Sequence, residues 1–295
     1  MTKVPAVPQT LSAIGPPPAD LPQQVSAALR EDIGSGDVTA ALVAIGQRAR
    51  GHVITRDYAV LCGQPWVEET FRQLDPAVEL QWQAAEGAIV KPGDVLLRFS
   101  GPARPVLTGE RTALNFLQLL SATATVASRY AQAVAGTGCV VLDTRKTIPG
   151  LRTAQKYAVR VGGARNHRIG LYDMVLIKEN HIIAAGSIGA AIAAARAGAP
   201  QVKVEAEVET LEQLDEALAA RPDFVLLDNF SITDLRAAVL RNRELGSRVK
   251  LEASGGTSLD TVHAIAETGV DYVSVGAITK HVQAVDLSMR LEFVR

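Results

Sequence analysis

Residues 143–181, DTRKTIPGLRTAQKYAVRVGGARNHRIGLYDMVLIKENH, contain eight lysines and arginines, although the chain as a whole has 30 Lys+Arg against 31 Asp+Glu. Guanidinium groups bind carboxylates through two parallel hydrogen bonds, whereas the lysine ammonium is a compact charge suited to phosphate. Arg145 and Arg168 are therefore candidate carboxylate ligands, and Lys146 and Lys178 are candidate phosphate ligands. This combination predicts a pair of substrates that carry both kinds of anion.

The other cations of this segment need not belong to the site. Arg152, Lys156 and Arg160 recur every four residues, which predicts an exposed stripe on a helix. His167 precedes Arg168 and can either donate to an anion or orient its neighbour, although a histidine beside an arginine is as often structural.

Two carboxylates, Glu205 and Asp228, end strand-like runs further along the chain. If these runs are neighbouring parallel strands, the two side chains lie side by side at one edge of the sheet. Such a pair can hold Mg²⁺ between itself and phosphate oxygens, or stabilise a developing positive charge. The alternative is structural ion pairs with Lys146 and Lys178, but burying four charges for structure alone stabilises little.

Glycine turns follow the last two strand-like runs, as Ser254-Gly255-Gly256 in ASGGTS and Val275-Gly276-Ala277 in SVGA. In parallel α/β barrels, the loops after the final strands bind phosphate through the main-chain N–H groups of helix N-termini. We therefore expect a phosphate site there, with an ordinary tight turn as the structural alternative.

The elements that must position these residues alternate between strand and helix in the second half of the chain. This alternation predicts parallel strands with right-handed crossovers, and ligands sit at the carboxyl ends of such strands. Both a doubly wound open sheet and a relative of the eight-stranded barrel fit the pattern. The strand-like runs are 139–144, 173–179, 201–208, 223–229, 249–255 and 271–277, and the helical segments are 187–198, 210–220, 231–245 and 258–269.

The first half of the chain is organised differently. The proline-rich residues 1 to about 20 predict a loosely ordered arm, and a helix over 21–34 follows, with Gly34 as its stop. Strand-like segments joined by KPGD and SGP turns, with a helix at QPWVEETFRQLD, predict a small α+β unit to about residue 110. A long helix over 109–136 leads into the second half.

Composition excludes several classes of function. A net charge of −1 argues against a nucleic-acid-binding surface, and no run approaches the roughly 20 apolar residues that span a bilayer. The N-terminus lacks the apolar run of a signal peptide, and Cys62 and Cys139 fit reduced thiols. No zinc-site spacing, Walker loop or dinucleotide glycine motif is present. We therefore expect a soluble cytoplasmic protein with no nucleic-acid or membrane partner.

Several motifs together closely resemble the quinolinate phosphoribosyltransferase family: GERTALNFLQLLS, DTRKTIPGLR, KYAVRVGGARNHRIGLYDMVLIKENHI, VEAEVETLEQLDEAL, LLDNF and SVGAITKHVQAVDLSMRLE. The likeness runs from about residue 23 to 295. It implies that quinolinate and phosphoribosyl pyrophosphate, with Mg²⁺, give nicotinate mononucleotide, pyrophosphate and CO₂, a step of de novo NAD biosynthesis.

The resemblance also implies an α/β fold in two parts, an N-terminal α/β sandwich and an incomplete parallel α/β barrel. The expected domains are a flexible arm over 1–22, the sandwich over 23–118 joined by the tail 280–295, and the barrel with the active site over 119–279. A homodimer, or a higher oligomer built from it, is implied, in which Arg111 of one subunit completes the site of its neighbour.

The likeness implies a role for each candidate residue. The carboxylates of quinolinate are expected to bind to Arg111, Thr144, Arg145, His167 and Arg168. The catalytic group is expected to be Lys146, Lys178, Glu205 and Asp228, with the lysines facing the ribose phosphate and pyrophosphate and the two acids facing the ribose hydroxyls and Mg²⁺. The 5′-phosphate is expected at Ser254, Gly255, Gly256, Val275, Gly276 and Ala277.

Two departures from the family pattern affect these expectations. The family has a third glycine where this chain has Ala164, after Gly162-Gly163. A methyl group there is tolerated in a helix but strained at positive φ. The tail AITKHVQ also differs, so the phosphate contact of that loop falls on Lys280 or His281.

Other functions remain compatible with the residues. A phosphoribosyltransferase of the same fold can act on another anionic heterocycle, and a barrel lyase can use Lys178 as a Schiff-base nucleophile. A non-catalytic anion-binding protein is a third alternative, but the presence of Glu205, Asp228 and both lysines argues against it.

Overall fold

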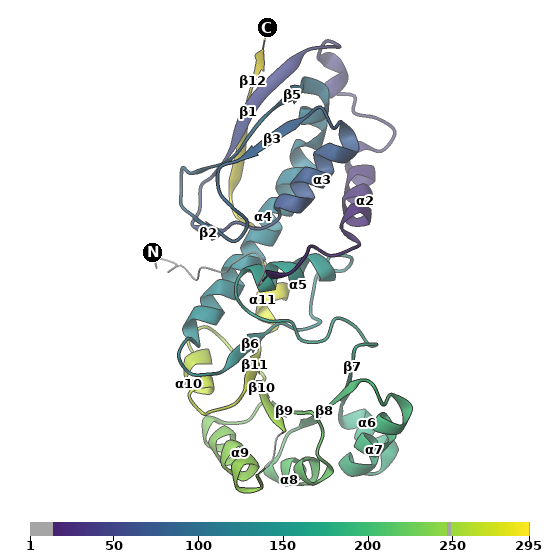
Figure 1. Cartoon of the computed structure of the whole chain (residues 1–295), viewed down its shortest axis with the longest axis vertical. Helices are drawn as coiled ribbons and strands as arrows, with labels where there is room; N and C mark the ends of the chain where they lie inside the picture. Colours follow the sequence, from purple (N-terminus) through teal and green to yellow (C-terminus); the bar gives the residue numbers. More distant parts are fainter. Residues whose placement is uncertain (1–13, 247–248, 295) are drawn as a thin grey trace. The chain divides into compact units, whose positions relative to one another are not determined.

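The computed structural model describes residues 14–246 and 249–294, whose elements are labelled in Figure 1. The chain divides into two compact units, of which the second comprises residues 130–146 and 164–277 and the first comprises the remainder. The division differs from the domains expected from the sequence, because residues 119–129, 147–163 and 278–279 belong to the first unit.

The first unit is built on a four-stranded antiparallel sheet with the strand order β12-β1-β5-β3. The C-terminal strand pairs with β1 along its whole length, with Arg48 opposite Val294 and Thr55 opposite Leu287. The strands are β1 (Arg48–Thr55), β3 (Glu79–Trp82), β5 (Val95–Pro102) and β12 (Leu287–Val294), and β2 (Ala59–Val60) pairs with β4 (Ile89–Val90) in a separate small sheet.

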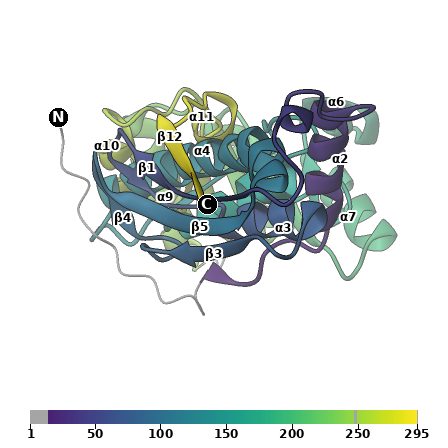
Figure 2. The same cartoon turned by 90° about the horizontal axis from the view of Figure 1, so that it is seen from above.

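Two helices, α3 (Gln64–Leu74) and α4 (Ala103–Ala133), form an apolar core together with this sheet. Phe71 of α3 and Leu114 of α4 belong to one buried apolar cluster with Leu97 of β5. Figure 2 shows the strands β1, β5 and β3 beside these helices. Apolar residues at helical spacing therefore pack against alternate residues of the strands. The remaining helices of this unit are α2 (Leu21–Ile33), α5 (Arg152–Val161), α11 (Ala277–Lys280), which begins at the last residue of the second unit, and the 3₁₀ turn η1 (Ala40–Leu42).

The segment just before α2 is packed rather than loose. Ile14 is 2% exposed and belongs to an apolar cluster with Val25 and Trp66. Its carbonyl oxygen accepts a hydrogen bond of 2.8 Å from Arg160 Nε. The expectation of a flexible arm over 1–22 is therefore wrong for residues 14–22, of which 21 and 22 already belong to α2, while residues 1–13 lie outside the described part of the chain.

Helix α5 is buried on most of its sides, which corrects a second expectation. Lys156 is fully buried, and the Arg160 guanidinium lies 5.6 Å from the ring centre of Tyr157. The exposed cationic stripe predicted for this helix is therefore wrong. A four-residue repeat of cations shows that side chains share a face, but it does not show what covers that face.

The second unit contains a six-stranded parallel sheet with the order β6-β11-β10-β9-β8-β7. The first strand of the unit lies beside the last, which is the order of a barrel, whereas a doubly wound sheet reverses its order near the middle. No pairing joins β6 to β7 among the described residues, so the barrel is incomplete. The α/β class is confirmed. The strands are β6 (Val140–Leu142), β7 (Met174–Ile177), β8 (Lys203–Val208), β9 (Phe224–Asp228), β10 (Lys250–Ser254) and β11 (Tyr272–Ser274).

Three of the helices between these strands begin at polar caps that the sequence supplies. The side chains of Ser187, Thr210 and Ser231 each accept a hydrogen bond from a main-chain N–H three residues later. No single helix among the described residues is long and apolar enough to cross a membrane, and only α6 with α7, bent by 91°, passes that test as a pair. The helices are α6 (Glu179–Ala185), α7 (Ile188–Gly198), α8 (Leu211–Ala220), α9 (Ile232–Glu244) and α10 (Val262–Ala266).

Candidate active site

Most of the predicted site residues lie at the carboxyl edge of the parallel sheet in the second unit. A short bridge holds the loop after α5 beside this edge, because Arg165 N donates to Val141 O at 2.9 Å and Asp143 N donates to Arg165 O at 3.1 Å. This bridge places His167 and Arg168 near the residues that follow β6.

Arg145 and Arg168 are brought together. Burial lowers the pKa of Arg168, and the neighbouring charge of Arg145 lowers it further. Arg168 Nη1 donates to the carbonyl oxygen of Met174 at 3.2 Å, whereas Arg145 Nε is buried without a hydrogen-bond partner among the described residues. Buried polar groups are nearly always paired, so this arrangement is one that a bound anion would stabilise.

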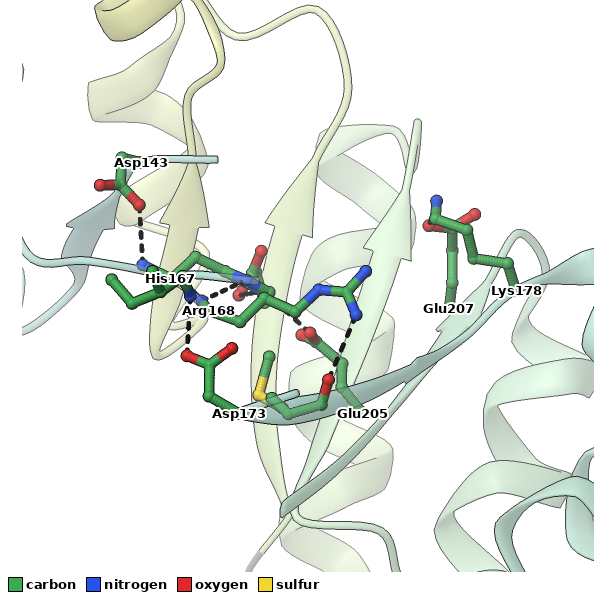
Figure 3. Close-up of polar contacts among 10 residues, drawn as sticks. Asp143, His167, Arg168, Asp173, Lys178, Glu205 and Glu207 are labelled. Atoms are coloured by element: carbon green, nitrogen blue, oxygen red, sulfur yellow. Dashed lines mark hydrogen bonds and ion pairs between the residues drawn. The ribbon is translucent and has the colours of Figure 1, made fainter. Parts of the chain in front are cut away.

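The imidazole of His167 is held from both sides within the protein. Its Nδ1 accepts the main-chain N–H of Arg168 at 2.8 Å, so the ring proton of the neutral form lies on Nε2. Nε2 is 2.8 Å from Glu205 Oε2, and the His167 main-chain N–H donates to Asp143 Oδ1 at 2.9 Å (Figure 3). His167 therefore fixes the loop that carries Arg168, and both of its ring nitrogens have partners within the protein.

Glu205 and Glu252 form a buried acidic pair next to His167. Both are at most 1% exposed, and Glu252 Oε2 is 3.5 Å from His167 Nε2. Burial raises the pKa of Glu205 to about 7, partly offset by a hydrogen bond from Glu252 and by Arg168. Burial and the charge of Glu205 raise the pKa of Glu252 to about 8. The pair therefore retains a proton under neutral conditions.

The same three side chains are close enough together to suggest a metal site. Nε2 of His167 and one oxygen each of Glu205 and Glu252 lie within 4.8 Å of one another. However, Nε2 carries the ring proton and donates it to Glu205, so it has no lone pair for a metal. Mg²⁺ also prefers a set of oxygen ligands that includes several waters, whereas one of the three groups here is an imidazole and both glutamates are buried. These residues therefore do not fit the expected Mg²⁺.

The strand register corrects the predicted pairing of Glu205 with Asp228. Glu205 lies opposite Phe224, four residues before Asp228 on β9. At about 3.3 Å per residue, the two are offset by about 13 Å along the strands, so one ion cannot bind both. The two runs are neighbouring strands, as predicted, but Glu205 lies three residues before the end of β8.

Glu207 is the carboxylate of β8 that reaches the edge. It lies opposite Leu226, two residues before Asp228 and on the same face of the sheet. It forms an ion pair with Lys178 Nζ, and the two side chains are 16% and 49% exposed. Figure 3 shows this pair apart from the cluster around His167. The alternation in VKVEAEVE already places both glutamates on one face, so counting to the end of the strand would have identified Glu207.

Lys146 lies against the glycine turn that follows β11. A Cβ built on Gly276 would be 3.1 Å from Lys146 Cδ and 3.4 Å from Thr144 Oγ1, and Thr144 Oγ1 accepts the Lys146 main-chain N–H at 3.1 Å. The stem of Lys146 therefore runs close along this turn, where a side chain at residue 276 would have to displace it by a few tenths of an ångström. Val275 is buried, and its main-chain N–H donates to the carbonyl oxygen of Leu142 at 2.9 Å, so it cannot also donate to a ligand.

The turn after β10 has backbone angles that favour glycine. Gly255 has a φ of 104° and Gly256 a φ of 54°, and Ser254 before them is partly buried. Both angles lie in the region that favours glycine, so a side chain at either position would strain the turn. The remaining predicted site residue, Arg111, is exposed on α4 and belongs to the first unit, as do the exposed Lys280 and His281.

The glycine run before Arg165 tolerates the alanine at its third position. The positive φ falls on Gly163, at 93°, whereas Ala164 has a negative φ. Gly162 is required for a different reason, because a Cβ there would lie 2.3 Å from the carbonyl oxygen of Ala124. Ala164 is not helical, but its methyl group introduces no backbone strain.

Comparisons with known proteins agree with this geometry. The chain matches the family profiles described as quinolinate phosphoribosyl transferase, N-terminal domain, over residues 37–121 and C-terminal domain over residues 123–290. The carboxylating nicotinate-nucleotide pyrophosphorylase of Mycobacterium leprae is 43% identical over 271 residues, covering 90% of this chain and 94% of that protein. A probable enzyme of the same name from Synechocystis is 40% identical over 89% of this chain and 90% of its own. The solved nicotinate-nucleotide pyrophosphorylase of Francisella tularensis superposes with a TM-score of 0.90 at 45% identity, over 95% of this chain and 99% of that one.

Proposed function

The chain belongs to the quinolinate phosphoribosyltransferase family, and we propose that the carboxyl edge of its parallel sheet is where the reaction takes place. As a member of this family it is a decarboxylating pentosyltransferase of NAD biosynthesis, which converts quinolinate and phosphoribosyl pyrophosphate to nicotinate mononucleotide, pyrophosphate and CO₂.

The observation that carries the assignment of the site is the arginine pair. Arg145 and Arg168 lie close enough for their charges to interact, and Arg145 Nε is buried without a partner among the described residues. Quinolinate carries two adjacent carboxylates, which can accept from both guanidinium groups and relieve their repulsion. Thr144 lies beside Arg145, and His167 would act by holding Arg168 in place rather than by touching the substrate.

Phosphoribosyl pyrophosphate would lie across the neighbouring strand ends. Lys146, against the turn at Gly276, and Lys178 would face its phosphates as compact positive charges. The Ser254–Gly256 turn and the main chain of Gly276 and Ala277 would hold the 5′-phosphate, whereas the N–H of Val275 is used by Leu142. Glu207 is paired with Lys178 at the exposed edge of the sheet. From this position it would also face the ribose hydroxyls.

The exposed edge offers a better place for Mg²⁺ than the buried cluster. Asp228, half-buried at the end of β9, and Glu207 would hold the ion together with the pyrophosphate oxygens and water. When bound, Mg²⁺ would neutralise charge on the pyrophosphate. Asp228 takes this role from the sequence prediction, and Glu207 replaces Glu205.

The chemistry follows from this placement. Arg145 and Arg168 hold the pyridine ring so that its nitrogen faces the anomeric carbon. The bond from that carbon to the pyrophosphate oxygen breaks with its electron pair, and the nitrogen lone pair forms the new C–N bond. Asp228 and Glu207 stabilise the positive ribose between these events. The cationic ring then accepts the electron pair of the bond to the 2-carboxylate, CO₂ leaves, and a proton is added at that ring carbon.

The proposal also covers the oligomeric state and the cellular location of the protein. A homodimer in which Arg111 completes the neighbouring site would supply a further cation for the second carboxylate. The free, buried Cys62 and Cys139 are compatible with the reducing cytoplasm. The phosphate contact expected from Lys280 or His281 stays a prediction.

Replacing Arg145 by alanine tests the site. The Arg145→Ala variant should raise the KM for quinolinate about 100-fold, since charge-assisted contacts contribute roughly 1.5–3 kcal/mol each, while the KM for phosphoribosyl pyrophosphate changes about threefold at most. Arg236→Ala, which removes an exposed arginine of α9, is the matched control and should leave both values unchanged. Equal increases of both KM values in Arg145→Ala would contradict the assignment.

A further inference from the structure

Asn229, directly after Asp228 at the end of β9, has a strained backbone. Its φ is 55°, and among the described residues only Arg221, with a φ of 53°, is another non-glycine residue with positive φ. This conformation is unfavourable for any residue with a Cβ, although asparagine tolerates it better than most. Strain of this kind persists where the surrounding contacts require it, and it is frequent at functional sites.

The contacts of Asn229 join two parts of the site. Its side-chain Nδ2 donates to Asp228 Oδ2 at 2.9 Å, and its main-chain N–H donates to the carbonyl oxygen of Ser254 at 2.9 Å. Its Oδ1 lies against Gly255, where a Cβ would be only 2.1 Å away. One side chain thus touches both the acid at the end of β9 and the glycine turn at the end of β10.

The positive φ is what makes both contacts available at once. Asp228 and Ser254 are register partners on adjacent strands, so an extended residue 229 would continue β9 beyond the turn. The left-handed bend instead folds the amide back between the Asp228 carboxylate and Gly255. The absence of a side chain at Gly255 makes room for it, because any Cβ there would collide with the amide.

These two parts would contact opposite ends of one substrate. Under the proposed function, Asp228 faces the pyrophosphate end, and the Ser254–Gly256 turn faces the 5′-phosphate. The distance between the two ends of phosphoribosyl pyrophosphate is set by a single ribose ring. A residue that fixes the spacing of the acid and the turn therefore acts on this substrate and has no contact that would affect the dicarboxylate.

We propose that Asn229 is a positioning residue that fixes the Asp228 carboxylate relative to the Ser254–Gly256 turn and so sets the affinity for phosphoribosyl pyrophosphate. This inference rests on the proposed function. It distinguishes the two substrates, because Asn229 would set the affinity for phosphoribosyl pyrophosphate, whereas the arginine pair would set the affinity for quinolinate.

The test is direct binding of phosphoribosyl pyrophosphate with Mg²⁺, measured by titration calorimetry without quinolinate, in the full-length protein. Asn229→Gly keeps the left-handed backbone without strain but removes the amide. It should weaken binding about tenfold, the effect of losing a hydrogen bond to a charged group, while its melting temperature stays the same or rises. Asn229→Asp places a second carboxylate beside Asp228 and should weaken binding at least as much. The KM for quinolinate should stay within about twofold of the wild-type value in both.

Two comparisons separate positioning from a general structural effect. Arg221→Gly relaxes the other strained residue of the same unit, away from the site, and should leave the affinity for phosphoribosyl pyrophosphate unchanged. In an Asp228→Ala background, Asn229→Gly should have almost no further effect, because the carboxylate it orients is gone. Wild-type affinity in Asn229→Gly, or equal losses for both substrates, would overturn the inference. Absence of quinolinate-dependent product in the wild-type protein would instead overturn the proposed function.

Discussion

Glu205 and Glu252 are two residues through which pH should act on the fold. Burial raises the pKa of both above the usual value near 4.5, to about 7 and about 8. The folded protein therefore binds more protons than the unfolded chain between roughly pH 4.5 and 8. The stability that these groups contribute is fully present below about pH 4.5 and is lost as the pH rises through 7 to 8.

The corresponding prediction concerns the free energy of unfolding. From pH 6 to pH 8.5 the denaturant midpoint of the wild-type protein should fall, and Glu252→Gln, which keeps a neutral hydrogen-bonding group, should flatten this decline. Exposed Glu244→Gln on α9 is the control and should follow the wild type. A midpoint that rises over this range, or an unchanged slope in Glu252→Gln, would show that the pair does not retain its proton.

The surroundings of Lys178 distinguish the phosphoribosyltransferase from a Schiff-base lyase. A lysine that attacks a carbonyl must be held as the free amine by burial or by neighbouring cations, whereas Lys178 is half-exposed and paired with the Glu207 carboxylate. Borohydride in the presence of a keto acid should therefore leave Lys178 unmodified, as checked by peptide mass analysis. A reduced adduct at Lys178 would favour the lyase.

At the scale of elements, the close approach of α5 to α4 depends on one glycine. Gly162, at the end of α5, faces the carbonyl oxygen of Ala124 so closely that a Cβ would lie 2.3 Å from it. Gly162→Ala should destabilise the fold by about 2 kcal/mol or more through overpacking. Ala164→Gly should change stability by about 1 kcal/mol at most. Urea unfolding of the two variants checks this contrast, and equal effects would contradict it.

Strands and helices could be predicted because their signals are local. The six apolar runs and the capped helical segments between them appear in the structure with shifts of a few residues. The burial of a side chain and the register of two strands depend instead on residues that are far apart in the sequence. Lys156 has the sequence pattern of a surface residue yet is buried. Counting along VKVEAEVE favours Glu207 over Glu205, but only the register shows how far Glu205 lies from Asp228. The strain at Asn229 has no sequence signal beyond a residue type that tolerates it.

At the scale of the whole molecule, the proposed dimer can be tested by complementation between two purified variants. If Arg111 completes the site of a neighbouring subunit, Arg111→Ala and Arg145→Ala homodimers should both be nearly inactive. Mixed dimers should contain one intact site of two and recover about half of the wild-type activity per dimer. The measurement is activity after the two purified variants are exchanged at varied ratios. No recovery in mixtures shown to contain heterodimers would place Arg111 outside the shared site.

The most direct test of the central assignment is a single assay of the purified protein with quinolinate, phosphoribosyl pyrophosphate and Mg²⁺, in which CO₂ and pyrophosphate are measured together. The two products should appear in equal amounts, and nicotinate in place of quinolinate should give little pyrophosphate, because the arginine pair is matched to two carboxylates. Pyrophosphate released without CO₂, or equal rates with nicotinate, would contradict the assignment of this site to a decarboxylating transfer onto quinolinate.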